Sequence, residues 1–218
     1  MPTSSEDRRY AAIIARRLKK HYPNATCSLD FRSPLELLVA TILSAQCTDE
    51  RVNMVTPGLF RKYPKTADFA RVPQEELEAA IRSTGFFRNK AKSIRACCQA
   101  MLEQHDGKVP DSMEALVALP GIGRKSANVI LGTAYGIGVG VVVDTHVTRL
   151  SRRMGLTRHK DAEKIERDLM ALFPKSRWID LGHELVQHGR RICTARKPKC
   201  DACPLGDLCP RIGLEAAN

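Results

Sequence analysis

The stretch ALPGIGRKSANVILG, residues 118–132, predicts two helices joined by a tight turn. The segment SMEALVAL before the turn has a helical apolar pattern, which Asp111 or Ser112 can cap. Gly121 and Gly123 allow positive φ and leave backbone amides uncovered. Those amides, with the unpaired N–H groups of the next helix, form a site for a phosphate. A plain helical hairpin that packs closely explains the stretch equally well, whereas the spacing in GIGRKS excludes a P-loop.

The second helix of this pair opens with Arg124 and Lys125, where the positive end of the helix dipole disfavours a cation. Repulsion from the dipole and from Arg124 favours the neutral amine of Lys125, which is a nucleophile. Downstream, the segment VVVDTHVTRL puts Asp144 directly before another helical pattern. A helix N-cap is the simplest role for that carboxylate, and it is compatible with a fixed charge in a cleft. His146, taken alone, is typical of a surface or packing position.

The composition of the chain excludes a disordered protein. With 218 residues, 43% of them hydrophobic, the chain can bury a core as one large domain or two small ones. The formal net charge of +11 favours a polyanionic partner, with nucleic acid ahead of an anionic membrane. No apolar run approaches the roughly 20 residues that span a bilayer, and the N-terminus lacks the pattern of a signal peptide. We therefore expect a soluble intracellular protein.

The apolar pattern along the chain is helical almost throughout. Ser33, Pro34 and Glu36 provide an N-cap, a proline at the first helical position and a capping-box glutamate for one helix. The stretch VGVVVDT at 139–145 has the β-branched content of a strand, but no second strand is available to pair with it, so we expect an extended connector. The glycine-rich GIGVGV, which begins at Gly136 and overlaps this stretch, is the expected crossing between two helical lobes. The other expected helices lie at about 5–20, 49–62, 73–83, 88–105, 112–118, 124–134, 145–154, 161–172 and 178–192.

Four of the eight cysteines form the pattern C-x6-C-x2-C-x5-C, and these are Cys193, Cys200, Cys203 and Cys209. In a reducing cytosol such a cluster indicates a metal site rather than two disulfides. Four thiolates suit zinc and a [4Fe–4S] cluster equally, although zinc ribbons usually show two C-x2-C pairs and this chain has one. Arg196 and Lys197 belong to a basic run between Gly189 and Cys200 that contains no acidic residue, so we expect this loop to contact phosphates.

Several blocks in order give the chain its resemblance to a known family. They are LVATILSAQCTDERVN, STGFFRNKAKSI, LPGIGRKSANVIL, VVVDTHVTRL and HGRRICTARKPKCDACPLGDLC. Taken together, these blocks resemble the endonuclease III family of DNA base-excision glycosylases over roughly residues 30 to 210. The resemblance implies an all-α fold of two lobes with DNA in the cleft between them. A six-helix barrel domain with the helix-hairpin-helix spans 28–138, and an iron–sulfur cluster domain combines 1–27 with 139–218.

The family's chemistry transfers to individual residues of this chain. Members remove oxidised pyrimidines from duplex DNA and then nick the strand. Lys125 matches the nucleophilic lysine, which attacks C1′ and leaves a Schiff base for β-elimination. Asp144 matches the aspartate that stabilises positive charge on the sugar and assists proton transfer. The 6-2-5 cysteine spacing resembles the family's [4Fe–4S] loop, so this cofactor is expected in place of zinc.

The resemblance also implies how DNA is held. The amides at Gly121 and Gly123 grip a backbone phosphate beside Arg124, and His146 matches a position lining the DNA side of the cleft. Gln46 matches a glutamine that fills the gap left by an extruded nucleotide, although a solvated helix end is its simplest interpretation. Phe86 stands where many members carry a leucine wedge, and a phenylalanine pair is ordinarily core. Val117 replaces a glutamate of many members, so no carboxylate role transfers there.

Two other classes fit part of the sequence. A monofunctional adenine glycosylase shares the fold and the cluster, but resembling members replace the lysine and carry a further C-terminal domain. A non-catalytic DNA-binding module leaves the pairing of Lys125 with Asp144 unexplained. The leading hypothesis is a bifunctional glycosylase and AP lyase that acts as a monomer on damaged double-stranded DNA. In a bacterial cell we expect it in the cytoplasm, associated with the nucleoid.

Overall fold

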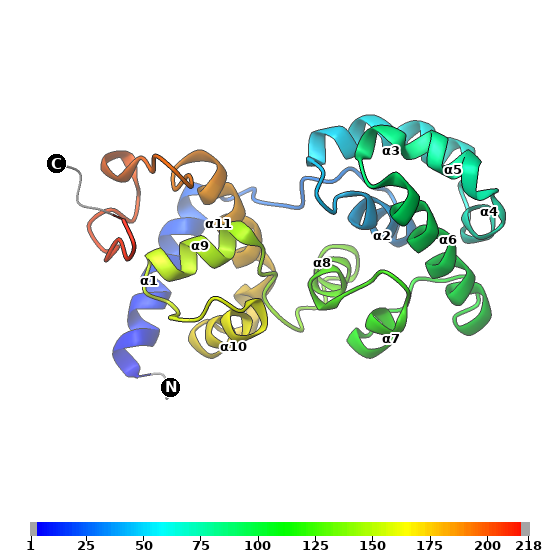
Figure 1. The fold of residues 1–218 in the computed structure, drawn as a ribbon. Coiled ribbons are helices and arrows are strands. Elements are labelled where there is room, and N and C mark those ends of the chain that lie inside the picture. The colour runs from blue at the N-terminus through cyan, green and yellow to red at the C-terminus, as the bar shows by residue number, and fades with distance from the viewer. Residues whose placement is uncertain (1–3, 215–218) are drawn as a thin grey trace. The chain divides into compact units, whose positions relative to one another are not determined.

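The computed structural model describes residues 4–214, and the chain divides into two compact units (Figure 1). One unit is Cys27–Ile137, and the other combines Met1–Thr26 with Gly138–Asn218. Residues 1–3 and 215–218, which the predicted cluster domain also includes, lie outside the described part. From residue 4 to residue 214 every regular element is an α-helix or a 3-10 helix, which confirms the predicted all-α class.

The unit Cys27–Ile137 carries the helical hairpin. Its longest helix, α6, packs against α4 and α5, while α8 packs against α2 and α7. The α4 helix was not expected from the sequence, because its six residues are too few to show an apolar period. The elements are α2 (Pro34–Leu43), α3 (Asp49–Lys62), α4 (Thr66–Arg71), α5 (Gln74–Ile81), η1 (Arg82–Thr84), α6 (Phe87–Gln104), α7 (Met113–Ala118) and α8 (Arg124–Tyr135).

The second unit combines the N-terminal helix with the C-terminal part of the chain. Its helix α1 packs against α10 and α11, and α11 packs against α9. Tyr10 on α1 donates to the carbonyl oxygens of Met154 at 2.8 Å and Leu208 at 3.3 Å, and Arg17 Nη2 donates to Asp207 at 2.9 Å. The bonds to Leu208 and Asp207 hold the C-terminal loop on the N-terminal helix, and the bond to Met154 holds the end of α9 there. The elements are α1 (Ser5–His21), α9 (Thr145–Arg153), α10 (Ala162–Leu172), η2 (Lys175–Arg177), α11 (Trp178–Arg191) and η3 (Cys200–Ala202).

The segment 139–144 is a connector without a strand, as predicted, although it bends at 139–140. It forms no strand, and Thr145 already begins α9. Val141 and Val143 are buried in the apolar core of their unit. The β-branched content of this segment therefore reflects packing of its side chains into a helical core rather than pairing of its backbone.

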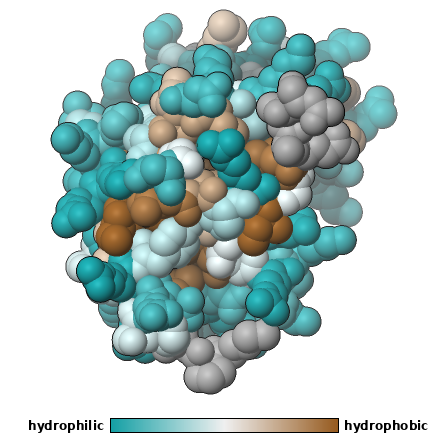
Figure 2. All heavy atoms as spheres, turned by 90° about the vertical axis from the view of Figure 1, so that its left-hand side faces the viewer, coloured by the Kyte–Doolittle hydropathy of each residue, from teal (hydrophilic) through white to brown (hydrophobic). Residues whose placement is uncertain are grey.

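The surface of the protein is mainly hydrophilic. On the face drawn in Figure 2, hydrophilic side chains predominate, and hydrophobic ones form patches that polar residues interrupt. None of the described helices is long and apolar enough to cross a membrane. This surface agrees with the net charge of +11, which favours an anionic partner.

Candidate nucleic-acid interface and metal centre

The predicted hairpin is formed by α7 and α8. Ser112 caps α7, because its Oγ accepts a hydrogen bond from the Ala115 amide at 3.3 Å. Gly121 in the turn has a φ of +80°, and a Cβ there would lie 2.9 Å from Cβ of Ser93. Gly121 is therefore required both by the backbone conformation and by the close approach to α6.

Gly123 differs from the prediction. Its φ is −95° and its ψ is 173°, so it is extended, and a Cβ there would meet nothing within 4 Å. Positive φ is needed at Gly121 but not at Gly123. Gly123 is instead the N-cap of α8, and no side chain caps this helix. The first-turn amides of α8 are thus left to bind an external acceptor such as a phosphate.

Lys125 is the second residue of α8, and its side chain is exposed, like that of Arg124. The position follows directly from the turn, because Gly123 ends the extended segment and Arg124 opens the helix. An exposed primary amine therefore stands beside the uncapped amides of the hairpin. This arrangement can bring a nucleophile close to a sugar whose phosphate the hairpin holds.

A pocket in the same unit brings three predicted DNA-contacting residues together. Gln46, which follows α2, Phe86, which precedes α6, and Gly121 of the hairpin all line it. Gln46 and Phe86 both have left-handed backbones, with φ of 53° and 48°. Such conformations are uncommon outside glycine and cost about 1–3 kcal/mol, which points to a function for these positions. The remaining lining residues are Thr41, Ile42, Ala45, Asn89, Lys90, Ser93 and Ser126.

Phe86 is not a core residue, although a phenylalanine pair ordinarily is. Its side chain is 61% exposed, whereas Phe87 is partly buried and begins α6. Gln46 is likewise exposed. Two exposed side chains of the size needed to enter a base stack therefore line one pocket.

Asp144 and His146 lie in the other unit, at the start of α9. Asp144 is the N-cap, and its Oδ1 accepts a hydrogen bond from the Val147 amide at 2.8 Å, so the capping role is confirmed. His146 Nδ1 lies 3.1 Å from Arg149 Nη2. Burial lowers the pKa of His146, while Asp144 opposes the shift. A Cβ on Gly189 would lie 2.9 Å from His146 Nδ1, so this glycine allows α11 to approach α9.

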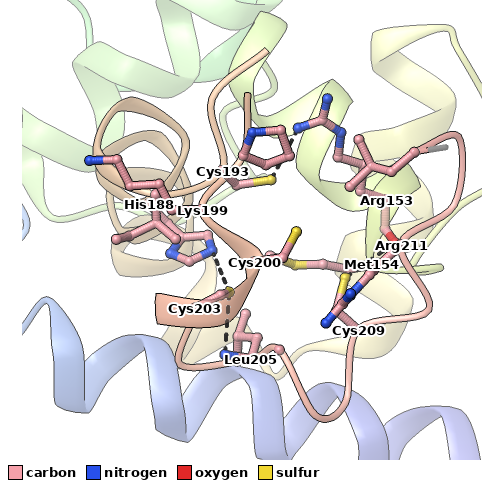
Figure 3. A pocket seen from close by; sticks show the side chains of 14 residues that line it. Arg153, Met154, His188, Cys193, Lys199, Cys200, Cys203, Leu205, Cys209 and Arg211 are labelled. Carbon is pink, nitrogen blue, oxygen red and sulfur yellow. Dashed lines mark hydrogen bonds between the residues drawn. The ribbon is translucent and has the colours of Figure 1, made fainter. Parts of the chain in front are cut away.

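The four clustered cysteines line one pocket, with their sulfur atoms around a common space (Figure 3). Burial raises the pKa of the Cys203 and Cys209 thiols, and the neighbouring cysteines raise them further. A metal centre would remove that penalty by binding the sulfurs as thiolates. Within residues 4–214 no group of three or more His, Cys, Asp or Glu side chains is arranged to hold a single metal ion. Four cysteines are the usual ligand set of a [4Fe–4S] cluster and also of a structural zinc, so the residues present fit either group.

Hydrogen bonds from the surrounding chain reach these sulfurs. Arg153 Nη1 donates to Cys193 Sγ at 3.3 Å, and the Leu205 amide donates to Cys203 Sγ at 3.4 Å. His188 Nε2 lies 3.5 Å from Cys203 Sγ (Figure 3). Donors to sulfur stabilise thiolate charge, so the pocket is prepared for an anionic sulfur centre.

Arg196 and Lys197 are exposed on a loop whose backbone is anchored. Arg153 donates to the carbonyl oxygens of Thr194 and Ala195, each at 2.7 Å, and Thr194 Oγ1 donates to the Lys197 carbonyl at 2.6 Å. The loop therefore presents two cations from a fixed backbone, which suits contacts with phosphates.

The sequence reasoning missed the arginines of α9 and Lys90. Arg149 donates to the carbonyl oxygens of Gly189 at 3.1 Å and Cys193 at 3.0 Å, and Arg153 acts beside it. The spacing of four residues between these arginines was visible in the sequence, but their targets lie about forty residues away. Lys90 is 4% exposed and has no sequence signal that separates it from the exposed Lys92 of the same helix.

Comparisons with known proteins agree with this geometry. The family described as HhH-GPD superfamily base excision DNA repair protein matches residues 39–175, and the iron-sulfur binding domain of endonuclease III matches residues 193–209. Endonuclease III of a Synechocystis species is 57% identical over 193 residues, 88% of each chain. Endonuclease III of Bacillus subtilis is 46% identical over 189 residues, 86% of each chain. A solved structure of a trapped covalent endonuclease III–DNA intermediate is 42% identical with a TM-score of 0.89, covering 94% of this chain and 96% of the other.

The fold and the matched regions define a base excision DNA repair protein built around a helix-hairpin-helix. The match at 193–209 also decides between the two cofactors, since it is a match to an iron–sulfur binding domain and so indicates a [4Fe–4S] cluster rather than zinc. The chain belongs to the endonuclease III family.

Proposed function

We propose that Lys125 is the nucleophile and Asp144 the catalytic carboxylate of this protein, which is a bifunctional DNA glycosylase and AP lyase that removes oxidised pyrimidines in base excision repair. The observation that carries the assignment is the exposed amine of Lys125 at the second residue of α8, next to the uncapped amides of the hairpin. The trapped covalent complex of the solved relative supports a nucleophile on the protein.

The chemistry divides into four steps. Lys125 Nζ attacks C1′, the glycosidic bond breaks, and the base leaves with the bonding electron pair and gains a proton. Opening of the sugar ring then gives a Schiff base between Lys125 and C1′. Loss of a proton from C2′ expels the 3′ phosphate by β-elimination, and hydrolysis releases the lysine. The carboxylate of Asp144 stabilises positive charge on the sugar and assists the proton transfers.

The nucleotide has to leave the base stack before C1′ can be attacked. We assign the filling of the resulting gap to Gln46 and the wedge between base steps to Phe86, because both are exposed and border the same pocket. The amides of the hairpin hold a backbone phosphate. The residues that complete the proposed DNA contacts are Gly121, Gly123, Arg124, His146, Arg196 and Lys197.

The proposed partner is damaged double-stranded DNA. A single chain supplies every proposed catalytic and DNA-contacting residue, so we expect a monomer to be active. Residues 28–138 are the proposed hairpin-bearing domain, and 1–27 with 139–218 the proposed cluster domain. In a bacterial cell, action on chromosomal DNA requires a cytoplasmic protein associated with the nucleoid.

Borohydride trapping tests the proposed nucleophile, since it reduces a Schiff base to a stable amine. We expect the wild-type protein to form a covalent complex with duplex DNA containing an oxidised pyrimidine, and Lys125→Met to form none. Lys108→Met is the matched control, because Lys108 is an exposed lysine of the same unit, and it should trap like the wild type. A covalent complex with Lys125→Met would remove the assignment. If the wild-type protein released the base without being trapped, a monofunctional glycosylase would be favoured. If it bound DNA without releasing the base, a non-catalytic module would be favoured.

A further inference from the structure

A buried lysine connects the two segments that carry Gln46 and Phe86. Lys90 lies in the first turns of α6 and is 4% exposed. Its Nζ donates to the carbonyl oxygen of Leu43 at 2.8 Å and to that of Thr84 at 2.8 Å. Leu43 is the last residue of α2, and Thr84 is the last residue of η1. One ammonium group therefore joins the ends of two separate helices.

Both of these helix ends lead into a strained turn. Gln46 lies three residues beyond Leu43, and Phe86 lies two residues beyond Thr84, each with a left-handed backbone. A left-handed backbone outside glycine persists only where the surroundings fix it. Lys90 also lines the pocket that Gln46 and Phe86 border, so it lies at the base of both segments rather than at a distance from them.

The cost of burying the Lys90 ammonium group indicates that its two hydrogen bonds hold the neighbouring segments in place. Burial lowers the pKa of Lys90, which means that the fold opposes the charge it encloses. Hydrogen bonds from a charged donor are short and stronger than neutral ones, and here they end on two carbonyl groups that are far apart in sequence. Any movement of one segment relative to the other would lengthen one of these bonds.

We propose that Lys90 is a positioning residue that holds the Gln46 and Phe86 segments at one fixed separation, so that both side chains enter the DNA together. This inference rests on the proposed roles of Gln46 and Phe86. Lys90 itself does not touch the reacting atoms, and its effect is on extrusion of the nucleotide rather than on the chemistry at C1′.

Stopped-flow fluorescence tests this role on a duplex that carries an oxidised pyrimidine beside 2-aminopurine, whose emission rises when it is unstacked. Lys90→Met keeps an unbranched apolar side chain but removes the charged donor, and we expect it to slow extrusion about tenfold or more, as misplaced groups do. Cleavage of an abasic site in a single-stranded oligonucleotide requires no extrusion and should be unchanged. Lys108→Met, which removes one positive charge from the exposed surface of the same unit, should match the wild type in both assays.

A double-mutant cycle shows whether Lys90 acts through the two side chains. Replacing both Gln46 and Phe86 by alanine should slow extrusion, and adding Lys90→Met to that protein should slow it little further, because coupled residues are not additive. The role of Lys90 would be overturned, with the roles of Gln46 and Phe86 intact, by either of two results. One is extrusion at the wild-type rate in a folded Lys90→Met protein, and the other is an effect of Lys90→Met that adds fully to that of the alanine changes. Unchanged extrusion in the alanine protein would instead overturn the proposed roles of Gln46 and Phe86.

A second variant keeps the test decisive if Lys90→Met does not fold. Lys90→Gln retains two N–H donors but is shorter, so it can reach only one of the two carbonyl groups. We expect intermediate extrusion on duplex DNA and unchanged single-stranded cleavage, measured at a temperature where circular dichroism shows full folding. Wild-type extrusion by Lys90→Gln would also overturn the role.

Discussion

Gly121 in the hairpin turn lies directly against Ser93 of α6, so closely that a Cβ on the glycine would come within 2.9 Å of the serine Cβ. The contact fixes the turn on the helix that begins with Phe87 and contains Lys90. The hairpin turn and the segment carrying Phe86 are thereby held on the same helix. Gly121 and Gly123 therefore differ in what a substitution would meet, although the sequence predicts the same role for both.

Gly121→Ala should lower the free energy of unfolding by about 1–3 kcal/mol, because alanine at positive φ is strained and its Cβ would collide with Ser93. Gly123→Ala should change it by less than about 1 kcal/mol, since the backbone is extended and the space is open. Urea denaturation of the two variants measures the difference. Equal losses would show that the contact with Ser93 does not constrain the turn.

Asp144 combines a cap and a proposed catalytic charge, and two substitutions separate them. Asparagine caps a helix as well as aspartate does, so Asp144→Asn should keep the stability, whereas Asp144→Ala should lose about 1 kcal/mol with the bond to the Val147 amide. Both variants lack the carboxylate and should be slowed in single-turnover base release, by at least about a hundredfold. DNA binding at low enzyme concentration should persist. Normal turnover by Asp144→Asn would leave Asp144 with the cap alone.

The sequence predicted those parts of the fold that depend on neighbours along the chain. The caps at Ser33 and Ser112 and the start of α8 after Gly123 are local effects of side-chain oxygens and of glycine, and the structure contains all of them. The family blocks supplied the activity and the cluster. Residue chemistry alone left zinc and iron–sulfur equal, because both bind four thiolates.

Features that depend on contacts between segments distant in the chain could not be predicted from the sequence. Lys90 and Lys92 lie on the same helix, and nothing in the sequence shows that the first is buried and the second exposed. The requirement for glycine at 121 comes from Ser93, and that at 189 comes from His146. The exposure of Phe86 contradicts the usual burial of phenylalanine, because α6 begins only at the following residue.

Loss of one ligand should remove the cluster. We expect the purified protein to be yellow-brown with about four irons per chain, as a [4Fe–4S] cluster requires. Cys203→Ser should lose most of the iron and the visible absorbance, because the hydroxyl is a poor substitute for a thiolate. Cys27→Ser, outside the cluster loop, should retain both. Iron and zinc are measured by elemental analysis, and stoichiometric zinc without iron in the wild type would contradict the cluster.

A buried ion pair near the end of the chain allows a test of stability that is independent of DNA. Arg177 Nη2 donates to both carboxylate oxygens of Glu184, at 2.8 Å and 2.6 Å, and the Glu184 side chain is fully buried. Arg177→Met leaves that carboxyl without its cation, which should lower the free energy of unfolding by about 3–5 kcal/mol at neutral pH. Lys19→Met breaks the exposed pair with Asp180 and should cost less than about 1 kcal/mol.

The penalty of Arg177→Met should also depend on pH. Burial raises the pKa of Glu184 even with Arg177 present, and the arginine opposes the shift. Without the arginine the pKa of Glu184 should rise further. Between the ordinary carboxyl pKa and this raised value, Glu184 is protonated in the folded variant and ionised in the unfolded chain. Stability contributed by that proton is present at low pH and is lost as the pH rises through the raised pKa. Denaturation midpoints of the variant and the wild type should therefore converge from pH 8 toward pH 5, and a gap that widens on acidification would show that Glu184 stays ionised in the variant.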